Sequence, residues 1–388
     1  MKTLMQMKET KKITYSTYPV TLEEALNKQM SQLQQTDKYR NNPAYVSAKY
    51  VKISNGATIS ASSVFLRSTP DFKNDPVASA FKGESVEIIE TIKGAEYDGS
   101  TTWYKIKYKG MTLYVHSSLV NANGKTATTT ANVNVQAEAR SSSHSYGQLS
   151  KGSSVSIIEE GKSWHQIEYS TWRNPTRSDV KNYLNPNNHD EFQHLVLSSS
   201  AEVPASQLNK VLQGKGALEG LGQAFIDGGK EHAVNEIYLI SHTLLETGHG
   251  KSTLAKGVEV GKNKNGNPVM VTSSNKNKLT NIKMVYNMFG IGAVDSNPLE
   301  GGAVRAYNEG WFTPKKAIIG GAKFIGSSYI HNQYKQNTLY KMRWNPANPG
   351  YPQYATDIGW AVKQVSQIKQ MYDKLDNPTL HFDIVKYK

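Results

Sequence analysis

The sequence contains no cysteine, and this absence excludes several kinds of site. Disulfide frameworks, zinc–thiolate sites, iron–sulfur clusters and thiol nucleophiles all require cysteine sulfur. Long apolar runs are also missing, since no stretch approaches the ~18 apolar residues that a membrane-spanning helix needs. Residues 1–12 carry charge but lack the apolar core of a leader peptide, so we predict no signal peptide within them.

Acidic residues are the scarcer charged class. The 388 residues include 45 Lys and Arg but only 32 Asp and Glu, which gives a formal net charge of +13. An excess of positive charge favours a polyanionic partner, such as nucleic acid, an anionic membrane surface or an anionic cell wall. No helix-turn-helix, RRM or zinc-finger pattern is present, so nucleic acid is not expected.

The first half of the chain reads as short strands separated by glycine turns. Alternating apolar residues predict strands at 64–67, 85–89, 103–108 and 112–115. Two patterns from this region recur later in the chain. K-G-x-x-V-x-I-I-E at 82–90 returns at 151–159, and W-x-x-I-x-Y at 103–108 returns at 164–169. We therefore predict two all-β barrel modules, at 51–122 and 127–185, the second with a variant C-terminal end.

Residues 1–50 are predicted to form an N-terminal extension with one short helix, because Thr21 and Glu24 have the spacing of a capping box. Residues 190–388 have helical periodicity instead of strand alternation, and are expected to fold as a separate domain. Helices are predicted at 208–212, 220–227, 231–246, 314–326 and 356–374, with a β-hairpin at 257–271.

The helix predicted at 231–246 carries the sharpest chemical signal. Its apolar face ends at Glu246, and the glycine-rich break Thr247–Gly250 follows. The negative end of a helix dipole and an apolar floor both disfavour a carboxylate, so the pKa of Glu246 is expected to rise. A glycosidase needs such a raised pKa in its general acid, which must hold a proton near neutral pH.

A metal site is the rival interpretation of this segment. His242, Glu246 and His249 would share one face if the helix continued, as zinc ligands can. However, Gly248 and Gly250 are expected to end the helix first, and the H-E-x-x-H motif is absent. We therefore predict no metal site and no cofactor.

The second half of the chain resembles a known enzyme family. The matching stretches include L-L-E-T-G at 244–248, Y-N-M-F-G-I at 286–291, Y-K-M-R-W-N-P at 340–346 and Q-Y-A-T-D at 353–357. Their types and order resemble the glucosaminidase domain of staphylococcal and bacillar autolysins, in glycoside hydrolase family 73. The β modules resemble tandem bacterial SH3-like (SH3b) domains. The resemblance implies a multidomain protein with a mainly α, lysozyme-like catalytic domain, a small β lobe and two SH3-like barrels.

The resemblance also implies roles for individual residues. Glu246 matches the catalytic acid, and Tyr354 matches a tyrosine beside the cleaved sugar. The second catalytic group is left open between Glu259, Asp295 and the acetamido group of the substrate itself. Residues expected to bind substrate are Asn287, Phe289, Gly290, Trp344, Gln353 and Asp357. An aromatic row is expected to be partly a sugar-stacking groove and about half buried core: Trp311, Tyr340, Trp344, Tyr351, Tyr354 and Trp360.

The function implied is peptidoglycan hydrolysis at the β-1,4 bond between N-acetylglucosamine and N-acetylmuramic acid. A muramidase or lytic transglycosylase on the same fold is the alternative enzyme, and a non-catalytic wall-binding protein is the alternative outside enzymes. The expected partners are glycan strands, with teichoic acids or stem peptides for the SH3b modules. The protein is expected to be a secreted, cell-wall monomer.

Overall fold

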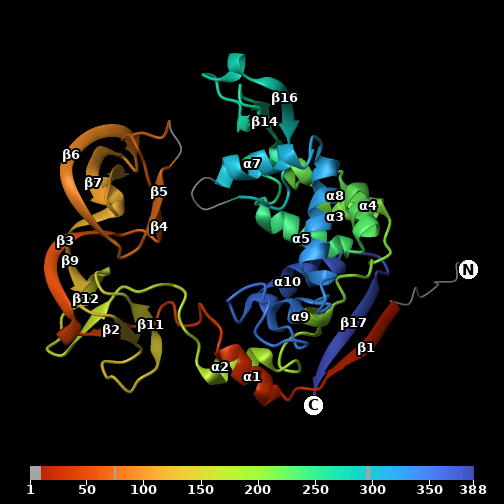
Figure 1. Ribbon diagram of the computed structural model, residues 1–388, viewed down its shortest axis with the longest axis horizontal. Helices are drawn as coiled ribbons and strands as arrows, with labels where there is room; N and C mark the ends of the chain where they lie inside the picture. Colours follow the sequence, from red (N-terminus) through yellow and green to blue (C-terminus); the bar gives the residue numbers. More distant parts are fainter. Residues whose placement is uncertain (1–9, 74–75, 294–297) are drawn as a thin grey trace, which may run out of the picture. The chain divides into compact units, whose positions relative to one another are not determined.

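The computed structural model describes residues 10–73, 76–293 and 298–388 (Figure 1). Contacts within the chain divide these residues into two units. The helical unit contains the described residues up to Gln34 together with Arg177–Lys388. The β unit contains Gln35–Thr176. The chain therefore leaves the helical unit, forms the whole β unit and returns to the helical unit.

The helical unit contains short helices around one large apolar core. In chain order the helices are α1 (Leu22–Met30), α2 (Arg177–Leu184), α3 (Ala205–Leu212), α4 (Gly222–His232), α5 (Glu236–Glu246), α6 (Thr253–Lys256), α7 (Pro298–Asn308), α8 (Pro314–Ile325), α9 (Leu339–Trp344) and α10 (Trp360–Tyr372). A small antiparallel sheet, the β lobe, has the strand order β15 (Pro268–Met270), β14 (Val258–Lys262) and β16 (Thr280–Val285). Within the described ranges, no helix has the length and hydropathy needed to cross a membrane.

The helix predicted at 231–246 is two elements. α4 ends at His232, and Ala233 adopts a left-handed conformation with φ of 49°. Asn235 then starts α5, because its side chain accepts a hydrogen bond from the Tyr238 N–H at 2.9 Å. The uninterrupted apolar pattern hid this boundary, although an asparagine cap was present in the sequence.

The N-terminal segment is built into the helical unit. β1 (Thr10–Tyr18) pairs in parallel with β17 (Thr379–Tyr387), so the first and last strands of the described chain lie side by side (Figure 1). α1 follows, and its predicted capping box is present: the Thr21 hydroxyl accepts from Glu24 N, and the Glu24 carboxylate accepts from Thr21 N. Segments at opposite ends of the sequence thus form one structure.

A second apolar cluster joins α1 and α2 to the C-terminal part of the helical unit. Leu26 of α1 and Leu184 of α2 are fully buried there, together with Tyr340 and Trp344 of α9. The sequence analysis placed α1 in a separate extension and α2 in the second β module. The structure instead places both helices in the helical unit, because their apolar faces pack against each other and in one cluster with α9 and β17.

The β unit is one continuous antiparallel sheet. Its strand order is β11 (Ser145–Leu149), β10 (Val133–Gln136), β2 (Ala44–Ser47), β13 (Trp164–Ile167), β12 (Ser154–Glu159), β9 (Val120–Thr129), β3 (Val51–Ile59), β6 (Ser85–Tyr97), β7 (Ser100–Tyr108) and β8 (Met111–His116). A separate hairpin is formed by β4 (Ser63–Leu66) and β5 (Ala78–Phe81). The predicted strands are therefore present, but β9 runs without a break across the expected module boundary.

Two apolar cores lie on this sheet, one for each predicted module. The first contains Val64, Leu66 and Ile106, which are nearly fully buried. The second contains Val155 and Ile167 and is completed by Ala44 and Val46 of β2. β2 was assigned to the N-terminal extension, but it pairs with β13 and contacts β10. Four residues are too short for alternation alone to identify such a strand.

If α1 is part of the helical unit, Leu26→Ala should lower the free energy of unfolding of that unit by about 2–5 kcal/mol, the usual cost of truncating a buried leucine. Leu33→Ala is the matched control, since Leu33 is 60% exposed. Urea unfolding followed by far-UV circular dichroism measures both changes. Equal, small losses for the two variants would show that the N-terminal segment is an appendage.

Candidate active site

α5 is buried on nearly all sides and delivers Glu246 to the surface. Buried residues follow one another from Glu236 to Ser241, and Thr243 and Leu244 are buried as well. A helix that is apolar all round lies at the centre of its domain. Glu246 is its last residue, and the Glu246 side chain is 40% exposed. The core thus holds one carboxylate at a fixed point where the helix meets solvent.

The turn after Glu246 is fixed by Thr247. The Thr247 hydroxyl donates to the Thr243 carbonyl at 2.6 Å and accepts from the Gly250 N–H at 2.8 Å. Gly248, His249 and Gly250 all have positive φ, so the helix cannot continue. His249 therefore leaves the helix face that would carry zinc ligands. Across the described ranges, no group of three His, Asp or Glu residues is placed to hold a metal ion.

The surroundings of Glu246 favour its protonated form. Burial raises the pKa of Glu246. One basic side chain lies close to this carboxyl group: His242 Nε2 is 3.6 Å from Glu246 Oε1. Burial lowers the pKa of His242 to about 4, so this imidazole is neutral near pH 7. The close approach is therefore not an ion pair at that pH, and it does not counteract the effect of burial on Glu246.

The Phe289–Gly290 turn lies beside the Glu246 carboxylate. Gly290 has φ of 63°, and a Cβ atom at this position would lie 3.3 Å from Glu246 Oε2. Asn287 holds the turn: its carbonyl oxygen accepts from the N–H groups of Phe289 and Ile291. Its amide donates to the carbonyls of Ile291 and Gly302. Asn287 is buried and fully engaged, so it shapes the turn and does not present its side chain to a ligand.

The Phe289 ring packs directly against Gly321. Its ring is 5% exposed and lies 5.8 Å from the His242 ring. On the other side it contacts Gly321 of α8, where a Cβ atom would fall 2.0 Å from Phe289 Cδ2. Gly320 leaves similar room for Trp311. The Gly320-Gly321 pair therefore sets how closely α8 approaches the turn that borders Glu246.

Tyr354 is electrostatically coupled to Glu246. Burial, then the Glu246 carboxylate and Tyr329, raise the pKa of Tyr354 to about 12. The Tyr354 hydroxyl therefore keeps its proton at physiological pH and can donate a hydrogen bond. Its ring stacks on Trp360 at 4.4 Å and lies 4.9 Å from the Tyr329 ring. Tyr329, in the π-helical turn Gly326–Ile330, was missed, because no sequence motif marks it.

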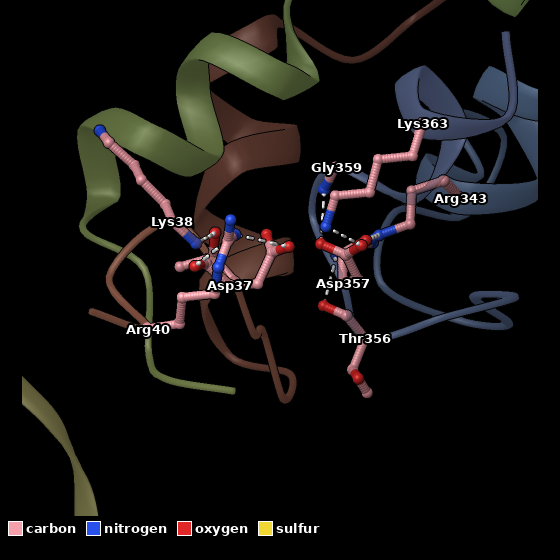
Figure 2. A network of polar contacts seen from close by, with 9 residues as sticks. Asp37, Lys38, Arg40, Arg343, Thr356, Asp357, Gly359 and Lys363 are labelled. Carbon is pink, nitrogen blue, oxygen red and sulfur yellow. Dashed lines mark hydrogen bonds and ion pairs between the residues drawn. The ribbon is translucent and has the colours of Figure 1, made fainter. Parts of the chain in front are cut away.

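Gln353 and Asp357, the other predicted substrate-binding residues around Tyr354, make contacts within the protein, and Figure 2 shows those of Asp357. The Asp357 carboxylate accepts from the Gly359 N–H at 2.9 Å and pairs with Lys363 at 2.8 Å. The Gln353 carbonyl oxygen accepts from Arg343 at 3.2 Å. Both side chains are partly exposed, but their polar atoms already hold the chain that carries Tyr354.

Trp344 belongs to the core. Its side chain is 1% exposed, and the Arg343 guanidinium lies 4.1 Å from its ring centroid. An indole with both faces covered has no surface left for stacking on a sugar, which corrects the substrate-binding prediction. Trp311 and Tyr340 of the aromatic row are also buried, whereas Tyr351, Tyr354 and Trp360 keep exposed surface. This division matches the expectation that about half of the row is core.

Of the two candidates for a second catalytic carboxylate, only Glu259 lies in the described part of the chain. Glu259 lies on β14 in the β lobe, where its carboxylate accepts from Lys276 at 3.0 Å. Its side chain is 40% exposed. Asp295 lies outside the described residues. The described part of the site therefore combines one carboxyl group, Glu246, with a protonated tyrosine hydroxyl and a turn shaped by glycine.

Known protein families match a part of each unit. The family described as mannosyl-glycoprotein endo-beta-N-acetylglucosaminidase matches residues 222–373, a range that contains Glu246, Gly290 and Tyr354. The bacterial SH3 domain family matches residues 62–121, which lie in the β unit. The second β core, around Val155 and Ile167, lies outside that SH3 match.

Several known proteins are similar to the chain. The beta-N-acetylglucosaminidase of Bacillus subtilis (strain 168) is 48% identical over 249 residues, which are 62% of this chain but 26% of that protein. A bifunctional autolysin of Staphylococcus epidermidis is 42% identical over 252 residues, which are 63% of this chain and 18% of that protein. The chain thus corresponds to only a small part of the length of these relatives.

Several solved structures are also similar to this chain in sequence. The crystal structure of the major bifunctional autolysin is 42% identical and has a TM-score of 0.45, over 56% of this chain and 84% of that one. The crystal structure of a catalytic mutant of S. aureus autolysin E in complex with the disaccharide NAG-NAM is 35% identical, with a TM-score of 0.43. That match covers 56% of this chain and 88% of the other.

The close contact of Phe289 with Gly321 predicts that alanine changes the stability in opposite directions at two helical glycines. A glycine-to-alanine change inside a helix ordinarily stabilises by about 0.5–1 kcal/mol. Gly321→Ala should instead destabilise by about 1–3 kcal/mol, because the new methyl group overpacks against Phe289. Gly228→Ala in α4 is the matched control, since its Cβ would meet Ala322 at an ordinary 3.4 Å. Thermal unfolding distinguishes the two, and a stabilised Gly321→Ala would contradict this account of the turn.

Proposed function

Because residues 222–373 form a glucosaminidase domain and residues 62–121 a bacterial SH3 domain, we propose that the chain is a peptidoglycan hydrolase. Its helical unit would cleave the β-1,4 bond between N-acetylglucosamine and N-acetylmuramic acid in glycan strands. The observation that carries this proposal is Glu246, a carboxyl group with a raised pKa at the exposed end of a buried helix.

Glu246 acts as the general acid in this proposal. Breaking a glycosidic bond leaves negative charge on the departing oxygen, which a proton from the acid neutralises. The raised pKa keeps that proton available near neutral pH, and His242, the neighbouring base, is neutral there and does not oppose it. A Cβ atom at Gly290 would lie 3.3 Å from Glu246 Oε2, so the glycine keeps a side chain away from the carboxyl oxygen that the substrate must reach.

The substrate's acetamido group is proposed as the nucleophile. Its carbonyl oxygen bonds to the anomeric carbon as the bond to the leaving oxygen breaks, and Glu246 protonates that oxygen. Water then attacks the anomeric carbon, and the bond from the acetamido oxygen to that carbon breaks, which restores the acetamido group. The water gives its proton to the Glu246 carboxylate, which restores the acid. Tyr354 keeps its hydroxyl proton and can orient the acetamido group by donating a hydrogen bond. Substrate assistance of this kind is an established exception to the use of two carboxylates.

The β unit is proposed to hold the enzyme on the cell wall. The SH3 family match covers the first core, and we propose that the second core is a second SH3-like module completed by β2. Stem-peptide carboxylates and teichoic acid phosphates are the anionic groups of the wall, and a net charge of +13 favours both. The protein is accordingly proposed to be a secreted, monomeric cell-wall enzyme.

Glu246→Gln tests the proposed acid, because it removes the proton donor and keeps the shape of the side chain. The rate of glycan cleavage should fall by at least ~10²-fold, while binding to walls is retained. Glu259→Gln provides the comparison and should lose far less, since the acetamido group serves as nucleophile. Release of soluble muropeptides measures both variants. Activity of Glu246→Gln within a few-fold of the parent would remove Glu246 from the mechanism.

The pH dependence follows from the sign of the pKa shift. The protonated form of Glu246 is the active one, so kcat/KM should fall as pH rises through the raised pKa of this residue. The descending limb should therefore lie above ~4.3, the ordinary pKa of glutamate. Soluble glycan fragments are the substrate, so that wall binding does not contribute. A rate that instead increases with pH across this range would identify Glu246 as a base.

A further inference from the structure

Arg343 of α9 is a fully buried cation. Its Nε donates to the Asp357 carbonyl at 2.8 Å, and its Nη2 donates to the Thr356 carbonyl at 3.2 Å. Its Nη1 donates to the Gln353 side-chain oxygen at 3.2 Å. Burial lowers the pKa of Arg343 to about 9, so the group remains charged at neutral pH. A buried charge of this kind must have its donors satisfied.

These acceptors bracket the candidate catalytic tyrosine. Gln353 precedes Tyr354 directly, and Thr356 follows it by two residues. The Asp357 carboxylate hydrogen-bonds to Gly359 and Lys363 and acts on Arg343 through its charge, which opposes the effect of burial on the pKa of Arg343. Arg343 therefore binds residues 353–357 through neutral oxygens on both sides of Tyr354, and the path of this loop depends on the orientation of the guanidinium (Figure 2).

A further acceptor for Arg343 comes from the far end of the sequence. Gln34 is 6% exposed, and its side-chain oxygen accepts from Arg343 Nη2. Gln34 also donates to Gln353 Oε1 at 3.3 Å, and the Leu33 carbonyl accepts from Gln353 Nε2 at 3.0 Å. The last residues of the N-terminal segment thus contact both Arg343 and the loop that it holds.

The rest of the N-terminal segment anchors this contact. Gln29 of α1 is fully buried and donates to the Trp344 carbonyl at 2.7 Å, and its own carbonyl accepts from Gln34 Nε2 at 2.9 Å. Leu26 packs in the same apolar cluster as Trp344. Gln34 is therefore held against α9 by a packed helix, as a positioning residue must be.

We infer that Gln34, acting through Arg343 and Gln353, is a positioning residue for Tyr354, and that residues 10–34 complete the catalytic unit. The β unit separates these residues in sequence from everything else that builds the site. The consequence for catalysis rests on the proposed function, whereas the consequence for the loop does not. Residues 10–34 are thus part of the catalytic unit and not an appendage of the β unit.

Gln34→Ala tests the inference through kinetics on soluble glycan fragments. Removing the acceptor frees the guanidinium to shift, and small displacements of catalytic groups are costly. We expect kcat to fall about 10-fold with little change in KM. Gln34→Glu keeps an acceptor oxygen for Arg343 but loses the donor to Gln29 and Gln353, so it should recover only part of the rate. Gln32→Ala is the matched control: it also deletes a glutamine of this segment, but one that is exposed and bonds to Ser31, so kcat should stay near that of the parent.

A double-mutant cycle separates positioning from general destabilisation. If Gln34 acts through the Tyr354 hydroxyl, Gln34→Ala should lower kcat by less than about 2-fold in a Tyr354→Phe background. Rate losses that multiply independently in the double mutant would overturn the inference, as would a 10-fold loss of kcat in the Gln32→Ala control.

Amide hydrogen exchange provides a measurement independent of activity. In Gln34→Ala the peptide that covers residues 351–358 should exchange at least several-fold faster, while α5 and β17 exchange as in the parent. Unchanged exchange in this peptide would overturn the inference, even if the rate falls. If the parent protein cleaves no glycan, the proposed function fails, and the exchange result alone then decides whether Gln34 holds the loop.

Discussion

The burial of α5 is the constraint on which the rest of the site depends. An 11-residue helix that is apolar on nearly every face must lie inside the helical unit, so its end can be placed at only one point of the surface. Glu246 occupies that end, and the Thr247 hydroxyl stops the helix there. The turn at Gly290 lies next to this carboxyl group, and the Phe289 side chain of the same turn packs against Gly321. The burial of α5 fixes the position of Glu246, and burial of the Glu246 carboxyl group raises its pKa.

The helical unit also depends on segments that lie on both sides of the β unit in the sequence. β1, α1 and Gln34 come before the β unit, while every other element of the helical unit comes after it. The parallel pairing of β1 with β17 and the burial of Leu26 beside Trp344 close this unit from both ends of the sequence. A fragment that begins after the β unit would lack β1 and the whole of α1, and would expose part of the apolar cluster. The independent folding of residues 190–388 that the sequence suggested is therefore not what these contacts favour.

Local signals in the sequence predicted what is locally determined. The Thr21–Glu24 capping box, the strands of the β unit and the helix end at Glu246 all depend on neighbouring residues, and the structure contains them. Nonlocal partners could not be predicted in this way. β2 is recognisable only through its pairing with β13, and Trp344 was assigned to a sugar groove because nothing local shows that α1 covers it. Asn287 and Gln353 were assigned to substrate, but their polar atoms hold the turns on which Phe289 and Tyr354 lie.

The central claim is that the helical unit cleaves glycan on the reducing side of N-acetylglucosamine by proton transfer from Glu246. Mass spectrometry of borohydride-reduced muropeptides from digested walls tests it most directly. The account predicts products whose reduced terminal residue is N-acetylglucosamine, and none of these above background for Glu246→Gln. Products ending in reduced N-acetylmuramic acid or in 1,6-anhydromuramic acid would contradict it, because they arise from cleavage of the other glycosidic bond.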